Sequence, residues 1–480
     1  MTETPMERRS LLRPLAFVVL VFGVIWCTMI VRWRMANRVP NGTDVALYLV
    51  ALPLGLLLGF VLLRKVIDAT KKRRQKAAQA DVADADAAEP VTPEDPSLAW
   101  QLPIFAANVL FAGGDTPAAL IDAARASQRA ELHPTLRDGQ GLPVFAVGVD
   151  DVDTAAIDDS LPDAAQGWSE SRKRALVLAQ TLATRVLDEH FDALRAADPS
   201  ADMPPGRAKP RPLLQLEWLL PAHWSDADRD AAQAWLTAQL AAQGWSAPSL
   251  QVTVSGIGSG AAALKRLDDL NRAFHGDAPR LPHLLLASDS HIDEASIAEW
   301  DAAHRLHGAS RPEGQVPGEG ACALLLAAKH PAGEAELARL HRLLAAQRAQ
   351  PVDKPGRLQA DTFNELVGQA LERTKLEADA PAHLVSDTDM RASRSAEAMH
   401  LVEQALPERD PIETLLPLGI ANGECGAALA LATVAVAAQL AVDTQQPGLI
   451  LSHHDASLRA VAVVTPPAPA TSTSTTPTLA

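Results

Sequence analysis

The sequence predicts a layered α/β domain that follows a hairpin of two transmembrane helices. Two apolar, uncharged runs lie near the N-terminus, and an acidic Ala/Pro-rich stretch separates them from the rest of the chain. Beyond that stretch, apolar segments of strand length alternate with segments whose apolar residues recur at helical spacing. This alternation favours an α/β domain with parallel strand pairs. A chain of 480 residues is long enough for more than one structural unit.

The first 76 residues are predicted to form a membrane anchor. "LAFVVLVFGVIWCTMIV" (15–31) and "VALYLVALPLGLLLGFVLL" (45–63) have the length and the apolar character of membrane-spanning helices, which need ~17–25 residues. No small-residue cleavage site follows the first run, so a retained helix is favoured over a removed leader. The segment between the runs is short, which predicts a hairpin.

The charges that flank the two runs predict the orientation of the anchor. Basic residues are densest after the second run, where they are Arg64, Lys65, Lys71, Lys72, Arg73, Arg74 and Lys76. The more basic flank of a membrane helix stays in the cytoplasm, so both ends of the hairpin and the large domain are expected there. The Ala- and Arg-rich composition favours the inner membrane of a Gram-negative bacterium.

The remaining chain divides into a linker, a globular domain and a tail. Residues 77–97 form the acidic linker, 98–465 the domain, and 466–480 a low-complexity, disordered tail. Strands are expected at 142–149, 212–220, 249–256, 281–288, 321–328, 382–387 and 460–464. Helices are expected at 171–194, 226–243, 259–276, 339–350 and 362–375.

Composition excludes several classes of function. The net charge of −15 argues against nucleic-acid binding, which requires a basic face. The three cysteines, Cys27, Cys322 and Cys425, have no metal-ligand spacing and are expected to be buried, inert thiols. "SGIGSG" lacks a third glycine at the offset that a dinucleotide-binding loop requires and the acidic residue ~20 positions further on. "VDDVDTAAIDDSLPD" (149–163) lacks the residue order of a calcium loop. No cofactor and no metal are therefore predicted.

Three consecutive motifs carry a family resemblance. "VTVSGIGSGAAALKRLDDL" (252–270) has the form of a strand, a tight elbow and a small-residue helix. "HLLLASDS" (283–290) and "VPGEGACALLLAAK" (316–329) follow in that order. The series resembles the β-ketoacyl synthases, whose fold is the thiolase-like fold. That resemblance implies two similar halves with central mixed sheets, placed here at about 98–330 and 331–465.

Three downstream segments extend the resemblance. "SDTDMRASRSAE" (386–397) is similar to the first histidine loop of the family, with Thr388 and Glu397 at matching positions. "GIANGECGAALALATVAVAA" (419–438) is similar to the helix of the second histidine, and "SHHDASLRAVAVV" (452–464) replaces the phenylalanine loop.

The family mechanism uses a cysteine thiolate at a helix N-terminus and two histidines. Ile257 stands at the position of the nucleophile and Ser386 at that of the first histidine. Gly423 stands at the position of the second histidine, or Asn422 if the match shifts by one residue. An aliphatic side chain forms no thioester, so the resemblance implies a chain without ketosynthase activity and without a catalytic residue at these positions.

A relocated acyl-transfer site is the alternative. Ser255 and Ser259 flank the elbow, while His453, His454 and Asp455 lie in the loop expected to face it, and Ser259 with His453 is the favoured pair. The competing interpretation is that Ser259 starts a helix and the histidines are polar loop residues, because no G-x-S-x-G elbow occurs.

The VPGEGA junction is expected to be structural. A buried carboxylate needs partners, so Glu319 is predicted to accept backbone hydrogen bonds that order the loop. The small residues beside it are expected to let a helix and a strand approach each other closely.

A tethered, inactive ketosynthase-like protein is expected to act by binding another protein. Its anchored layout is loosely similar to the type VI lipase adaptors, which suggests a role with secretion or virulence effectors. The alternatives are an acyl-chain or acyl-carrier binding protein, or an acyltransferase that uses the relocated serine and histidine. The resemblance also allows a homodimer, as in the family.

Overall fold

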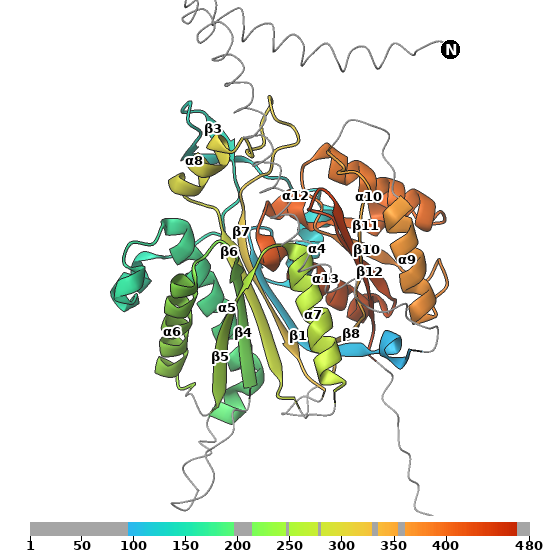
Figure 1. Cartoon of the computed structure of the whole chain (residues 1–480), viewed down its shortest axis with the longest axis horizontal. Helices are drawn as coiled ribbons and strands as arrows, with labels where there is room; N and C mark the ends of the chain where they lie inside the picture. Colours follow the sequence, from blue (N-terminus) through green and yellow to red (C-terminus); the bar gives the residue numbers. More distant parts are fainter. Residues whose placement is uncertain are drawn as a thin grey trace, which may run out of the picture. The chain divides into compact units, whose positions relative to one another are not determined.

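The computed structural model describes residues 95–195, 214–245, 249–276, 280–328, 335–353 and 361–467. The predicted membrane segments 15–31 and 45–63 lie outside the described residues, as do nearly all of the predicted linker 77–97 and tail 466–480. The description below therefore concerns the globular domain alone (Figure 1).

The described residues of the first half contain seven strands. Its elements are η2 (Pro96–Ala99), β1 (Gln101–Phe111), α4 (Pro117–Arg125), β2 (Leu132–Arg137), β3 (Pro143–Phe145), η3 (Ala155–Ser160), η4 (Asp163–Ala165), α5 (Glu170–Arg195), β4 (Leu214–Pro221), α6 (Asp226–Ala242), β5 (Leu250–Ile257), α7 (Gly260–Phe274), β6 (His283–Ser290), α8 (Glu294–Ala302) and β7 (Glu319–Leu326).

In the part of the second half that the structure describes there are six strands and a long apolar helix. Its elements are β8 (Ala338–His341), β9 (Leu344–Gln347), α9 (Asp361–Thr374), β10 (His383–Ser386), α10 (Ala392–Ala405), α11 (Pro411–Thr414), β11 (Leu415–Pro417), α12 (Leu418–Asn422), α13 (Gly426–Thr444), β12 (Gly448–Ser452) and β13 (Leu458–Thr465).

The two halves repeat one strand topology. The path through the sheet is β1-β7-β6-β4-β5 in the first half and β8-β13-β12-β10-β11 in the second, while β9 lies off this path beside β13. The last strand of each half, β7 or β13, lies beside the first strand of that half and is antiparallel to its neighbours, and the other pairs along the path within each half are parallel. β1 pairs with both β7 and β8, which joins the halves into one 11-stranded sheet.

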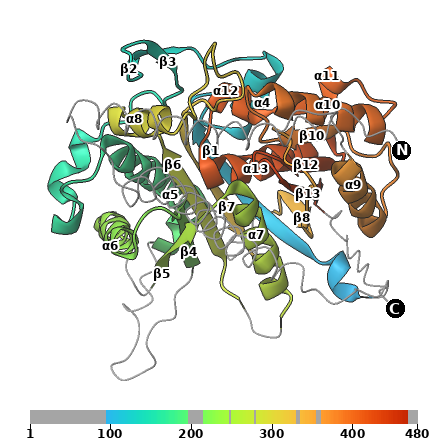
Figure 2. The same ribbon diagram turned by 45° about the horizontal axis from the view of Figure 1, so that its top comes forward.

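Helices form the layers on either side of this sheet. α5 packs against β6 and β7 on the outer face of the first half, and α9 packs against β13 on the outer face of the second. α7 and α13 pack against each other, and α13 also contacts β6 and β7 of one half and β10 and β12 of the other. Figures 1 and 2 show both helices between the two groups of strands.

The apolar helix α13 is the centre of the core. Among the described residues it is the one helix long and apolar enough to cross a membrane, and 72% of the segment is buried inside the domain. Val434, Ala435 and Val436 are fully buried in the largest apolar cluster, which both halves share. Its apolar character therefore has a structural explanation, because helices enclosed on all sides are hydrophobic all round.

Two predicted elements are wrong. Residues 339–350 were expected to be a helix but form the short strands β8 and β9, which pair with β1 and β13. Residues 142–149 were expected to be one buried strand, but only β3 forms there, and it pairs with β2 in a separate two-stranded sheet. The strands β1 and β12 were not predicted at all.

Candidate functional site

The strand, tight turn and helix that the family resemblance predicted as an elbow are present in the structure. An aliphatic residue and a helix-capping serine occupy this elbow. Ile257 ends β5 and packs against the main core. Ser259 is the N-cap of α7, and its Oγ accepts a hydrogen bond from Ala262 N at 3.2 Å. Ser255 Oγ donates to Glu217 Oε1 at 3.1 Å. The two serines therefore serve as a helix cap and a strand contact, which are common structural uses of Ser.

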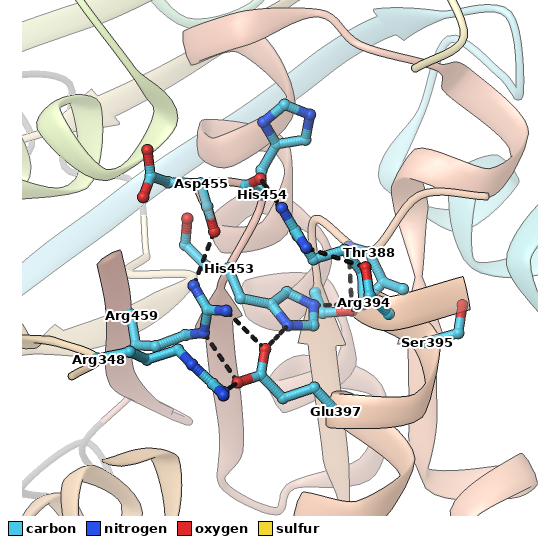
Figure 3. A network of polar contacts seen from close by, with 12 residues as sticks. Arg348, Thr388, Arg394, Ser395, Glu397, His453, His454, Asp455 and Arg459 are labelled. Atoms are coloured by element: carbon cyan, nitrogen blue, oxygen red, sulfur yellow. Dashed lines mark hydrogen bonds and ion pairs between the residues drawn. The ribbon is translucent and has the colours of Figure 1, made fainter. Parts of the chain in front are cut away.

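The position of the first family histidine begins a buried chain of polar contacts. Ser386 ends β10 and is fully buried, with its Oγ 2.6 Å from Thr388 Oγ1. Thr388 Oγ1 lies 2.6 Å from His453 Nε2, and His453 Nδ1 lies 3.4 Å from Glu397 Oε2 (Figure 3). Both ring nitrogens of His453 are thus engaged, and among the described contacts it shares no hydrogen bond with Ser259.

Glu397 anchors that chain. Its carboxylate accepts from Arg459 Nε at 3.1 Å and pairs with Arg348 (Figure 3). Burial raises the pKa of Glu397, but hydrogen bonds from His453 and Arg459 outweigh burial and hold the pKa at about 2. Glu397 is therefore a carboxylate at neutral pH and is fully paired, which suits a structural role.

The position of the second family histidine has no room for an imidazole. Gly423 has φ 67°, and a Cβ there would lie 2.8 Å from the carbonyl oxygen of Val316. The side chain of Asn422 is hydrogen-bonded to the backbone. Its Oδ1 accepts from Gly113 N at 2.9 Å, and its Nδ2 donates to the carbonyl of Leu418 at 2.8 Å. Whether Gly423 or Asn422 is matched to the second family histidine, no titratable side chain stands at that position.

Glu424, the next residue along the chain, belongs to a cluster of paired charged side chains. Glu424 Oε2 lies 2.5 Å from His454 Nε2, which is also 3.5 Å from Asp389 Oδ2. Arg391 Nε lies 2.8 Å from Asp389 Oδ2. Burial alone would lower the pKa of His454, but the adjacent Glu424 and the hydrogen bonds to Asp389 and Glu424 raise it to about 10.

The same pairing lowers the carboxylate pKa values. Burial raises the pKa of Glu424, but the charge of His454 and its hydrogen bond outweigh burial and bring the pKa to about 2. The pKa of Asp389 is also lowered, because His454 and Arg391 outweigh its burial. The sequence identified His454 as a candidate but missed Glu424, although Glu424 directly follows the expected histidine position.

Glu319 of the VPGEGA junction is fully buried and fully satisfied. It accepts from Val149 N at 2.6 Å, from Arg174 Nε at 2.7 Å and from Ser290 Oγ at 2.7 Å. The structure confirms the expectation that this carboxylate orders a loop.

The glycines on either side of Glu319 are required by close contacts. A Cβ on Gly318 would lie 2.1 Å from the carbonyl oxygen of Asn422, and one on Gly320 would lie 2.2 Å from Phe111 Cδ1. The first contact brings the junction against the backbone of α12, and the second brings β7 against a ring on β1. The expected close approach of a helix and a strand is therefore found.

The thiols and carboxylates of this region do not form a metal site. Cys322 and Cys425 are fully buried and free, and burial raises the pKa of each thiol. Within the described ranges, no group of three His, Cys, Asp or Glu side chains is arranged to hold a metal ion.

A large cavity on the described part of the domain lies away from the elbow. It has a volume of about 1200 Å³ and is lined by β2, by residues 146–150 and by the first residues of α5 and α8. None of Ile257, Ser259, Ser386, Gly423 and His453 lines it.

The sequence matches no protein-family model and no curated protein. The structure, in contrast, is similar to many solved ketosynthases. A ketosynthase from module 6 of the bacillaene synthase of Bacillus subtilis aligns with a TM-score of 0.54 and 10% identity, over 77% of this chain and 72% of that one. A β-ketoacyl synthase from Burkholderia phymatum aligns with a TM-score of 0.51 and 13% identity, over 76% of this chain and 99% of that one.

A third structure contains a partner protein. It is a type II polyketide ketosynthase in complex with its acyl-carrier protein, and it aligns with a TM-score of 0.50 and 14% identity over 76% of this chain and 99% of that one. These identities are low and the coverage is high, so the likeness concerns the fold. The repeated strand order and the position of α13 between the halves agree with it, and the domain has the thiolase-like fold of the ketosynthases.

Proposed function

We propose that this protein is a catalytically inactive, membrane-anchored ketosynthase-like protein that acts by binding another protein. The observation that carries the proposal is the occupation of the family's three catalytic positions. Ile257 is a partly buried aliphatic side chain that packs against the core, Ser386 is a buried link in a hydrogen-bond chain, and the position of Gly423 has no room for a side chain. A nucleophile and two imidazoles are what the family mechanism needs, and these three positions supply neither.

The relocated acyl-transfer site has little support. A general base must reach the proton of its nucleophile, and both nitrogens of His453 already have partners in Thr388 and Glu397. Ser259 Oγ caps α7. The residues that replace the family site pair with one another, so they stabilise the fold and leave no acid and base poised for a substrate.

The location of the protein belongs to the same proposal. The two apolar runs 15–31 and 45–63 would anchor it in the bacterial inner membrane, and the basic flank after the second run would keep the domain in the cytoplasm. Fusions of a cytoplasmic and a periplasmic reporter after residue 97 test the orientation. Activity of the periplasmic reporter alone would contradict it.

The absence of catalysis is tested with the purified full chain and a malonyl-loaded acyl-carrier protein. We expect no release of CO₂ and no condensation product above the heat-treated control. The Ile257→Cys variant is also expected to be inactive, because the histidine positions are still Ser386 and Gly423. Turnover by the unaltered chain would refute the proposal, and tight binding of the carrier without turnover would favour the acyl-carrier alternative.

A further inference from the structure

The cavity near α8 has a strongly acidic rim. Four exposed carboxylates line it, and they come from separate segments: Glu131, Asp150, Glu170 and Glu294. The exposed acidic segment that leaves the cavity extends the same charge and contains Asp150, Asp151, Asp153, Asp159 and Asp163, while Asp158 of the same segment pairs with Lys173 at 2.6 Å. The volume of about 1200 Å³ exceeds the roughly 300–1,000 Å³ of most small-molecule sites.

The basic side chains at the cavity do not offset this charge. Arg174 is bound to Glu319, which is itself fully buried. Burial and the adjacent Arg174 lower the pKa of His133, so His133 is neutral at pH 7. Arg129 is the remaining lining cation, and it is exposed at the rim.

Exposed apolar side chains lie on the hairpin that forms one wall. Leu132 on β2 is 53% exposed and lines the cavity, and Leu142 before β3 is 56% exposed. Within the described residues the third large exposed apolar side chain is Ile412 on α11, outside the cavity lining. The small β2–β3 sheet therefore presents apolar surface next to the acidic rim, a combination typical of interaction sites.

We propose that this cavity with its acidic rim, the acidic groove, is the docking site for a basic segment of a partner protein. The Arg or Lys side chains of that segment alternate with apolar residues. The cations would pair with Glu131, Asp150, Glu170 and Glu294, and an apolar side chain would pack on Leu132. Charge complementarity selects this occupant, because a phosphate-bearing ligand or an anionic membrane surface would be repelled. The inference rests on the proposed function and names the partner class for it.

The test uses the purified full chain and two fluorescent peptides, one of alternating Arg and Leu and one of alternating Glu and Leu. The Arg peptide is expected to bind, to weaken as salt rises, and to bind about tenfold more weakly to the Asp150→Lys/Glu294→Lys variant. The matched control is Glu365→Lys/Glu372→Lys, which reverses two exposed charges on α9 and should bind as the unaltered chain does. Equal binding of the Glu peptide, or no effect of the groove reversal, would overturn the inference.

The chain's own basic run at 71–76 is the competing occupant. Replacement of Lys71, Lys72, Arg73, Arg74 and Lys76 by Gln should leave binding of the Arg peptide unchanged. A tenfold gain in affinity would mean that this segment fills the groove, and the assignment to a partner protein would be wrong.

Photo-crosslinking in cells separates failure of this surface from failure of the proposed function. A photoreactive residue at position 132 should crosslink to a basic peptide of a partner protein, whereas one at position 412 should not. The Asp150→Lys/Glu294→Lys variant should lose the crosslink at position 132. A partner that copurifies equally well with the Asp150→Lys/Glu294→Lys variant would support the proposed function but refute the groove as the docking site. Recovery of no partner protein by copurification or crosslinking would refute the proposed protein-binding function itself.

Discussion

At the scale of single residues, Glu319 shows how a catalytic-looking motif supports the fold. Its carboxylate joins Val149 of a loop, Arg174 of α5 and Ser290 of β6. The sequence predicted a buried, hydrogen-bonded carboxylate there because an unpaired one would be costly. It could not predict Arg174, which lies 145 residues away in the chain.

Removal of this carboxylate should destabilise the domain strongly. Glu319→Ala leaves Arg174, whose side chain is 16% exposed, without its ion-pair partner, and we expect a loss on the order of 3–5 kcal/mol in the free energy of unfolding. Glu319→Gln retains one acceptor oxygen and should lose less. Urea denaturation measures both, and Glu365→Gln on the surface of α9 should change stability by less than about 0.5 kcal/mol. A Glu319→Ala chain as stable as this control would contradict the structural role.

His454 should make stability depend on pH. Its pKa is about 10 in the folded chain against an ordinary histidine value of 6.5, so its stabilising contribution is complete below pH 6.5 and is lost as pH rises through about 10. Glu424, with a pKa of about 2 against 4.5, contributes above pH 4.5 and loses its contribution as pH falls through about 2. Denaturation midpoints of the unaltered chain should therefore fall between pH 6.5 and 10.

The His454→Asn variant isolates this effect. It should lack the part of the decline between pH 6.5 and 10 that His454 causes, whereas His400→Asn on the surface of α10 should retain it. Parallel curves for His454→Asn and the unaltered chain would show that the ion pair with Glu424 does not form.

At the scale of elements, Ser259 distinguishes a helix cap from a nucleophile. Ser259→Ala removes the hydrogen bond to Ala262 N and should cost about 1 kcal/mol of stability, while Ser259→Asp should restore it because Asp is also a good N-cap. Thermal or urea denaturation measures the difference, and Ser225 at the start of α6 offers a matched cap for comparison. Equal loss from Ala and Asp would contradict the capping role.

The errors of prediction at this scale have a common physical cause. Residues 339–350 have apolar side chains at Leu340, Leu343 and Leu344, a spacing typical of a helix. Pairing with β1 and β13 instead makes two four-residue strands of them, so tertiary contacts override the local pattern. In contrast, α5, α6, α7 and α9 were predicted within a few residues because their periodic patterns are long.

The candidate site was predictable only as a set of positions. The motif spacing matched Ile257, Ser386 and Gly423 to the family's catalytic positions as a prediction, and the structure shows that a side chain is excluded at Gly423. The pairing of Glu424 with His454 depends on loops that meet in space, and no sequence period reports such a contact.

At the scale of the whole molecule, the two halves should unfold together. β1 pairs with strands of both halves, and α13 packs against both. All tryptophans that the structure describes lie between Trp100 and Trp300, so intrinsic fluorescence of the domain reports the first half. Its urea midpoint should coincide with that of far-UV circular dichroism, which reports the whole domain.

A core substitution in the second half sharpens this test. Leu401 of α10 is fully buried, and Leu401→Ala should lower stability by about 2–5 kcal/mol and shift the tryptophan transition by the same amount. Ile412→Ala, at a side chain that is 81% exposed, should shift neither transition. A tryptophan midpoint unchanged by Leu401→Ala would show that the halves unfold independently.

The double pairing of β1 also has a consequence for biosynthesis. β1 is the first strand of the domain to leave the ribosome, yet its partners β7 and β8 are made ~200 residues later. At about 5–20 residues per second, this strand waits roughly 10–40 s with both edges unpaired. An apolar strand without neighbours is prone to aggregate, so the nascent chain needs protection from a chaperone over that interval. The strand that unites the finished molecule is thus also one that stays unpaired for long during its synthesis.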